Sequence, residues 1–201
     1  MYHRQPQPEE IPGYTYGSPA LPSSPVTLEE LEKLKAAVMF SDDDVAALRM
    51  AGDVLATQLD DILDVWYGFI EANPFLLHYF STPDEQPISD YLRHVRARFG
   101  MWILDTCYRP YDQAWLDYQY EIAQRHYRTK KNTTDHVNST PLINYHYIVA
   151  LIYPITATVK PFLSNRGHSA DDVERMYRAW CKSVTMQVAL WGSPFMNADA
   201  F

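Results

Sequence analysis

One histidine stands at the end of an apolar helical stripe in the stretch YEIAQRHYRTKKN, residues 120–132. The stripe consists of Trp115, Gln119, Ile122 and His126, whose spacing of four and three residues places them on one face of a helix. An imidazole on that face can ligate a transition metal through one ring nitrogen. It can also be a core histidine whose ring nitrogens are satisfied by hydrogen bonds, which is the more common case for a lone histidine.

Cationic side chains surround this histidine: Arg125, Arg128, Lys130 and Lys131. Beside an apolar cavity they would bind the acidic groups of a flat apolar cofactor. Haem has this chemistry, because its iron binds imidazole and its propionates are anionic. The alternative is a solvated helix end whose cations balance the helix dipole. His146 and His94 are the rivals of His126 as a ligand, and His146 ranks second after His126 because it lies on the predicted buried helix, residues 142–163.

Motifs for other site chemistries are absent from the sequence. There is no GxGxxG, Walker loop, HExxH or CxxC, and no Ser-His-Asp pattern near a sharp turn. No Glu-x-x-His occurs, which argues against a di-iron helical bundle. No CxxCH occurs either, so a haem would be bound without covalent attachment.

Charge and cysteine content restrict the class of partner. The net charge of −8 at pH 7 argues against nucleic acid as the main partner. Cys107 and Cys181 lack metal or redox spacing and are interpreted as buried thiols in a reducing compartment. No signal peptide is visible, and the most apolar stretch, residues 148–159, is too short to span a bilayer. We therefore expect a cytoplasmic protein with no membrane partner.

Hydrophobic periodicity predicts one all-α domain of roughly eight helices. Thr27 with Glu30 and Ser41 with Asp44 have capping-box spacing, and Gly52 is a predicted break between two helices. The predicted helical segments are 28–39, 41–73 in two parts, 74–80 as a short turn, 88–107, 112–127, 142–163 and 169–191.

Residues 142–163 are apolar nearly all round, which predicts a buried central helix that bends at Pro154. The first 25 residues are rich in proline, glycine, tyrosine and serine and show no periodicity, which predicts an extended arm that packs on the rest of the chain.

Several contiguous motifs resemble the protoglobins, single-domain haem proteins related to globin-coupled sensors. The matching stretches, in order, are IPGYTYG, DDILDVWYG, RARFGMWILDT, WLDYQYEIAQRHYRTKKN, YPITATVKPFL and QVALW. The resemblance implies a globin-like fold with an extra N-terminal helix and an extended N-terminal arm. It divides the chain into an arm near the haem (residues 1–25), a globin domain (26–193) and a tail (194–201).

The resemblance also implies non-covalent haem b, with His126 as the proximal iron ligand. Tyr67 corresponds to the distal tyrosine that meets a bound gas, and Trp66 to its neighbour on the access route. Phe99 corresponds to a distal-wall phenylalanine and Phe80 to the phenylalanine that packs on the haem. The other predicted haem contacts are Val95, Arg98, Ile122, Ile143, Ile148 and Leu151.

Two positions depart from the family pattern. Leu151 stands where relatives carry phenylalanine, which predicts a larger pocket. Tyr127 stands where relatives carry a second histidine, and we expect it to lie outside the pocket.

The main functional prediction is a haem b globin that reversibly binds O2, CO or NO at a five-coordinate iron. The alternatives are a haem enzyme that removes NO or other reactive nitrogen or oxygen species, and a gas-sensing subunit that acts through a separate partner. A homodimer is predicted through the last two long helices, on the apolar residues of 142–163 and on Val184, Val188 and Trp191.

Overall fold

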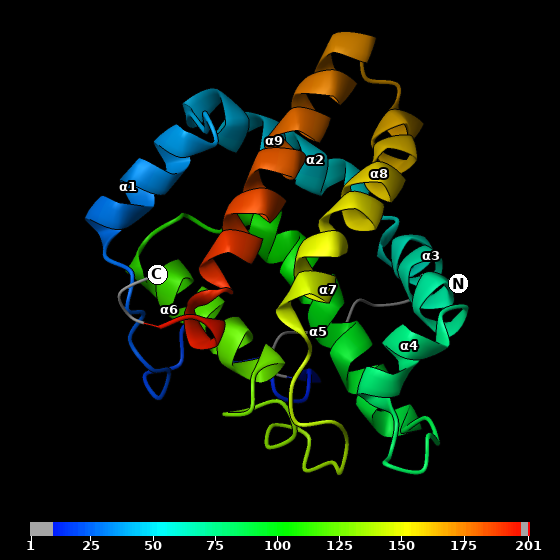
Figure 1. Cartoon of the computed structure of the whole chain (residues 1–201). Helices are drawn as coiled ribbons and strands as arrows, with labels where there is room; N and C mark the ends of the chain where they lie inside the picture. Colours follow the sequence, from blue (N-terminus) through cyan, green and yellow to red (C-terminus); the bar gives the residue numbers. More distant parts are fainter. Residues whose placement is uncertain (1–9, 198–200) are drawn as a thin grey trace.

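The computed structural model of the chain describes residues 10–197 and residue 201, and this part is all-α as predicted (Figure 1). No β-strand forms within it; one isolated bridge joins Ser81 and Pro87. The α-helices are α1 (Leu28–Ala37), α2 (Asp42–Leu55), α3 (Leu59–Glu71), α4 (Pro74–Leu77), α5 (Ser89–Tyr108), α6 (Gln113–His126), α7 (Tyr145–Ala150), α8 (Ile152–Leu163) and α9 (Ala170–Leu190). Short 3-10 turns follow α4, α8 and α9 at His78–Phe80, Ser164–Arg166 and Ser193–Phe195.

Side-chain caps begin several helices where the sequence predicts them. Thr27 accepts a hydrogen bond from the Glu30 backbone nitrogen, and Ser41 with Asp44 forms both halves of a capping box. These bonds satisfy backbone N–H groups that have no partner within the first turn. Pro74 stands in the first turn of α4, where its missing N–H costs nothing.

The predicted helix break at Gly52 is wrong. Helix α2 continues through Gly52 to Leu55 and ends there. A Cβ on Gly52 would lie 2.6 Å from the Tyr108 ring and 2.9 Å from the Cys107 Cβ. The glycine therefore allows α5 to pack closely against α2, and its small size rather than its flexibility explains its presence.

Helix α9 packs along α2 and α8, and α2 also packs on α5 (Figure 1). The centre of this packing is strongly aromatic, with Trp115 and Trp180 fully buried. Such rings bury large apolar areas and stabilise the core. This frame leaves α5, α6 and the end of α9 side by side with α3 and α7, where the cavity described below is found.

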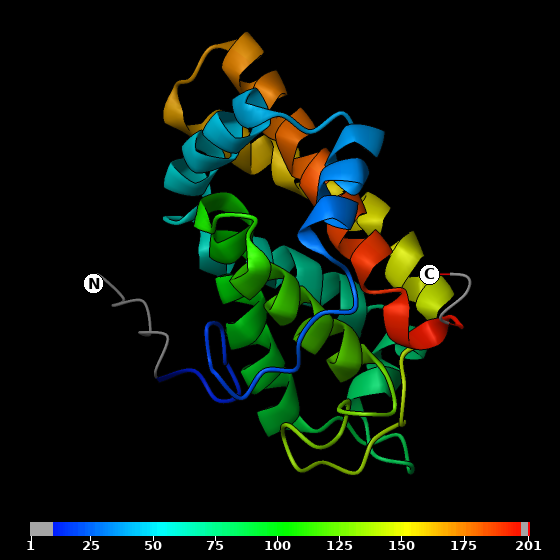
Figure 2. The ribbon, with the colours of Figure 1, turned by 90° about the vertical axis from the view of Figure 1, so that its left-hand side faces the viewer.

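The described part of the N-terminal arm, residues 10–26, lies along α5 and α6 (Figure 2). Ile11 is buried, and the Tyr14 hydroxyl donates to both carboxylate oxygens of Asp105 at 2.7 and 2.9 Å. The rings of Tyr14 and Tyr16 contact Tyr118 edge-on, with centroids 5.6 and 5.2 Å away. The arm is thus held by specific side-chain contacts with two helices.

The predicted buried central helix over 142–163 is corrected by the structure. The segment forms α7 and α8, which meet at Leu151, three residues before Pro154. Proline cannot donate to the carbonyl four residues earlier, which explains a break there. Much of this segment is accessible to solvent: Val149 is 43% exposed and Tyr153 is 77% exposed.

The apolar helical run is also longer than the sequence pattern predicts. It covers Tyr145–Arg166, 22 residues, and an 18-residue window within it has a mean hydropathy of 1.3, so it is long and apolar enough to cross a membrane. Length and composition alone do not separate a membrane span from a helix that packs against protein. The run leaves an apolar face that no described part of this chain covers completely.

Two further expectations differ from the structure. Val184, Val188 and Trp191, predicted to lie on a dimer surface, are buried inside the subunit. Their side of α9 faces the cavity and α6 instead of solvent. Cys107 is buried as predicted, whereas Cys181 is only partly buried.

Candidate functional site

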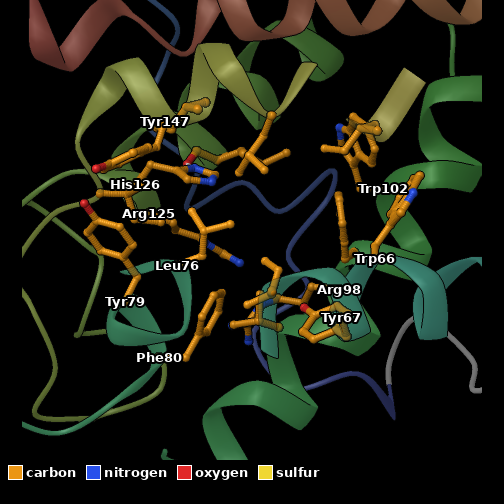
Figure 3. Close-up of a pocket in the computed structure, with 18 of the residues that line it drawn as sticks. Trp66, Tyr67, Leu76, Tyr79, Phe80, Arg98, Trp102, Arg125, His126 and Tyr147 are labelled. Carbon is orange, nitrogen blue, oxygen red and sulfur yellow. The ribbon is translucent and has the colours of Figure 1, made fainter. Parts of the chain in front are cut away.

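An apolar cavity of about 350 Å³ lies between α3, α5, α6, α7, α8 and the end of α9 (Figure 3). Every residue that the sequence singles out as a site residue lines it. These residues are Trp66, Tyr67, Phe80, Val95, Arg98, Phe99, Ile122, His126, Ile143, Ile148 and Leu151. The first and the last of them, Trp66 and Leu151, are 85 residues apart in the sequence, so only the fold brings the set together.

His126 is held in one tautomer by its own helix. Its Nδ1 lies 2.8 Å from the carbonyl oxygen of Ile122, one turn earlier. A carbonyl oxygen can only accept, so Nδ1 carries the proton and Nε2 keeps its lone pair. Burial lowers the pKa of His126, which also favours the neutral ring. The structure thus presents a neutral imidazole with one nitrogen free to ligate.

The orientation of the His126 ring is fixed by neighbours outside its helix. The Trp191 ring stacks on it, with centroids 5.3 Å apart and planes at 16°. The Trp191 indole nitrogen in turn donates to the Gln119 side-chain oxygen at 2.8 Å. Gln119 therefore has a positioning role, which explains a polar residue in the apolar stripe of α6. The Ile143 backbone nitrogen donates to the His126 carbonyl at 2.9 Å.

The rival histidines lie outside the cavity. The His94 Nδ1 is 3.1 Å from Asp135, and His146 is exposed and packs against the Tyr147 ring. Among the residues that the structure describes, His126 is the only histidine that lines the cavity. Within the same residues no group of three or more His, Cys, Asp or Glu side chains could hold a metal ion. Any metal in the cavity would therefore need most of its ligands from a cofactor.

An aromatic cluster closes the end of the cavity opposite Tyr79 and Tyr147 (Figure 3). Trp66 lies 4.8 Å from the Phe99 ring, and Phe99 stacks on Trp102 at 5.1 Å. The indole nitrogen of Trp66 donates to the Thr158 hydroxyl at 2.6 Å, which links α3 to α8. These rings form rigid walls suited to a flat apolar ligand.

Tyr67 differs from these rings because its hydroxyl is uncommitted. The side chain is 7% exposed, its ring meets Phe99 edge-on at 6.5 Å, and the Arg96 guanidinium lies 5.7 Å from the ring centroid. Within residues 10–197 and 201 no group is hydrogen-bonded to its hydroxyl oxygen. Burial raises its pKa, so the hydroxyl keeps its proton and can donate to a ligand in the cavity.

Two arginines tie the cavity to the N-terminal arm. Arg98 forms a bidentate pair with Asp135 and donates to the Pro12 carbonyl at 2.7 Å. Arg125 pairs with Glu121 at 3.0 Å and donates to the Gly13 carbonyl at 2.6 Å. Both guanidinium groups therefore already have a carboxylate partner, which Arg125 shares with Lys130.

Gly13 allows this close approach. Its φ is +74°, a conformation that favours glycine, and a Cβ there would lie 2.8 Å from the Arg98 guanidinium. Larger residues at this position would push the arm away from the cavity.

Further cavity residues were not identified as site residues from the sequence. The main ones are Leu76, Tyr79, Tyr91, Trp102, Tyr147 and Trp191. Most are aromatic residues on helix faces that a sequence pattern assigns equally well to an ordinary core. Lys131, one of the four cations that the sequence suggests for the acidic groups of a cofactor, also lines the cavity, and a lysine inside an apolar cavity is unusual.

The sequence matches the protoglobin family over residues 27–200. The chain belongs to the protoglobin family. Its all-α architecture is accordingly a globin-like fold, and the protein is of the gas-binding haem type. A comparison with curated proteins found no match.

The cavity of this protoglobin fits a haem by its own chemistry. Its walls are aromatic and apolar, His126 offers a free Nε2, and Lys131 is a buried cation that suits an acidic group. A bound haem would supply an iron that His126 would hold, and Tyr67 and Phe99 line the same cavity. The protein residues supply the rest: orientation, exclusion of water and a hydrogen-bond donor.

Proposed function

We propose that this protoglobin binds haem b without covalent attachment, through Nε2 of His126, and reversibly binds diatomic gases such as O2, CO and NO at a five-coordinate iron. The observation that carries the proposal is the hydrogen bond from Nδ1 of His126 to the Ile122 carbonyl. It leaves Nε2 as the only ligating nitrogen and points to a neutral, strongly donating imidazole. No second histidine lines the cavity among the described residues, which supports an open sixth position.

An absorption spectrum of the purified protein tests this proposal. After reduction with dithionite, we expect a five-coordinate ferrous haem that binds CO and O2 and releases both. A haem-free protein that does not take up added haem would contradict the proposal. If the reduced protein gives the spectrum of a six-coordinate haem, the proposal of an open sixth position is wrong, but the proposal of haem binding stands.

We keep a second function, removal of NO or reactive nitrogen or oxygen species, because of the Tyr67 hydroxyl. A donor without a protein partner can stabilise negative charge that develops on a ligand during a reaction. Slow oxidation of the ferrous O2 complex supports gas binding. Rapid turnover of NO in the presence of a reductase supports the enzyme.

We also propose that two subunits associate through the exposed apolar face of α7 and α8. Val149 and Tyr153 on this face are exposed in the single chain, and association would remove their apolar surface from water. The buried residues of α9 take no part in this revised interface. Sedimentation at micromolar concentration should show about twice the mass of one chain, 23.3 kDa, and a single species at 23.3 kDa would contradict the dimer.

Two free cysteines, one buried, are consistent with our further proposal of a cytoplasmic location.

A further inference from the structure

The cations that line the cavity are not equivalent. Arg98 and Arg125 each form an ion pair with a carboxylate, at 2.6 and 3.0 Å. Lys131 is more deeply buried than either, with 2% of its surface exposed, yet no described carboxylate forms an ion pair with it. A buried ammonium without a counter-ion is unfavourable, because its lost hydration is not replaced by an opposite charge.

The contacts of Lys131 hold its ammonium in place without neutralising it. Its Nζ donates to the Tyr79 carbonyl oxygen at 2.8 Å and lies 3.5 Å from the Ser139 hydroxyl. It also lies 5.3 Å from the centroid of the Tyr91 ring. An ammonium has three hydrogens to donate, and the two contacts with oxygen atoms use at most two of them. One donor and the full positive charge remain for a ligand.

The position of Lys131 defines one end of the cavity. Its acceptor residue Tyr79 stands with Tyr147 at the end opposite Trp66 and Trp102 (Figure 3). The Tyr147 ring meets the Tyr79 ring edge-on at 6.1 Å. The cavity therefore has a tyrosine-lined end with an unpaired cation and an indole-lined end without one.

We propose that Lys131 binds a carboxylate of the cofactor and thereby sets which edge of the flat ring faces the Tyr79 end. This inference rests on the proposed function, since it concerns the cofactor of the same site. The ligand must be a carboxylate attached to an apolar ring. A free small anion would gain the charge pairing but would leave the apolar walls exposed to solvent. Burial lowers the pKa of Lys131 to about 8, which agrees with a cation that has no carboxylate partner among the described residues.

The test compares two porphyrins that differ only in their acids. Full-length protein without haem is titrated with metal-free protoporphyrin IX and with its dimethyl ester, and binding is followed by quenching of tryptophan fluorescence. The metal-free ring removes the contribution of His126 and isolates the carboxylate contact. We expect the wild type to bind the free acid more tightly than the ester.

Lys131→Gln is the informative variant, because it keeps a donor for the Tyr79 carbonyl and removes the charge. We expect it to reduce the preference for the free acid by about tenfold or more, the effect of one charge-assisted hydrogen bond. Lys131→Met removes both and should have the same effect on the preference. The matched control is Lys130→Gln, since the adjacent Lys130 pairs with Glu121 and does not line the cavity. It should keep the wild-type preference.

The outcomes separate the two proposals. If the wild type binds neither porphyrin and takes up no haem, the proposed function fails. If it binds both and Lys131→Gln leaves the preference unchanged, the haem function stands and the role of Lys131 is wrong. Millimolar acetate should weaken neither titration; strong competition by acetate would instead indicate a free-anion site.

Discussion

The two sides of the cavity are built differently. On one side, His126 is fixed by a hydrogen bond within its helix and by the stacked Trp191. On the other side, the ring of Tyr67 is fixed by packing but its hydroxyl has no partner within the described residues. A ligand that must stay benefits from a rigid support, whereas a donor to a transient ligand must be free before that ligand arrives. This contrast is what we expect if, as proposed, one side holds the cofactor and the other contacts the gas.

The largest expected effect, on haem binding, comes from removing the His126 side chain. His126→Ala should weaken haem binding by at least about a hundredfold, more than the loss of an outer-shell contact to a metal ligand. Added imidazole should restore a five-coordinate ferrous spectrum by filling the space left by the side chain. His146→Ala, at an exposed histidine, is the control and should bind haem normally. A wild-type spectrum in His126→Ala without imidazole would falsify the assignment.

A smaller effect concerns the stability of the haem-free protein. The pKa of Lys131 is about 8 in the folded state, below its ordinary value of 10.5, so the unfolded chain binds more protons between these pH values. The contribution of Lys131 to the free energy of unfolding therefore rises as the pH rises from about 8. Between pH 8 and 9.5 the wild type should gain about 1.5 kcal/mol relative to Lys131→Met.

Other titratable and charged groups also line the cavity, and their contributions to the pH dependence of stability cancel when the wild type is compared with Lys131→Met. These groups are Tyr79, Tyr91, Tyr147, Asp135, Arg98 and Arg125. Urea denaturation at several pH values measures this difference. Parallel pH profiles for the two proteins would show that Lys131 is not charged and unpaired in the cavity.

The Tyr67 hydroxyl, which has no partner within the described residues, should affect the dissociation of O2 more than that of CO. Tyr67→Phe removes one hydrogen bond of about 1–1.5 kcal/mol to O2, which corresponds to about tenfold in affinity. Most of this should be seen as faster O2 dissociation, because the bond exists only after the gas binds. CO carries less negative charge and should respond less. Stopped-flow displacement measures both rates, and equal changes for the two gases would indicate a steric role for Tyr67.

The smallest effect is expected at Leu151, which lines the cavity where α7 and α8 meet. A phenylalanine there fills more of the cavity, so Leu151→Phe should slow CO association by a few-fold without changing haem binding. Flash photolysis measures the association rate. An unchanged rate would mean that this side chain does not limit access to the iron.

The sequence predicts His126 better than the rest of the site for a physical reason. Its position on the inner face of α6 and its hydrogen bond to Ile122 depend on neighbours one turn away, which periodicity describes. Helix starts at Thr27 and Ser41 were predictable for the same reason. Tyr67, Phe99 and Leu151 line the same cavity only because distant helices pack together, and the family resemblance rather than periodicity pointed to them.

The wrong predictions concern tertiary packing. Position 52 is a glycine because Tyr108 packs closely against it, and no local signal in the sequence shows that contact. The α7–α8 segment is apolar nearly all round but only partly buried. The sequence could not predict this, because apolar composition does not tell whether the surface that covers a helix comes from the same chain. Lys131 was visible only as one of several cations, because its lack of a counter-ion depends on a pocket formed by Tyr79, Tyr91 and Ser139.

Resonance Raman spectroscopy of the reduced, haem-loaded protein tests the central claim most directly, because it detects the bond between iron and imidazole. We predict an iron–histidine vibration in the wild type that shifts when histidine is labelled with heavy nitrogen and that disappears in His126→Ala. Unlabelled imidazole added to the labelled His126→Ala protein should restore an iron–imidazole vibration that shows no isotope shift. A histidine vibration that persists in His126→Ala, or one absent from the wild type, would contradict the assignment of Nε2 of His126 as the iron ligand.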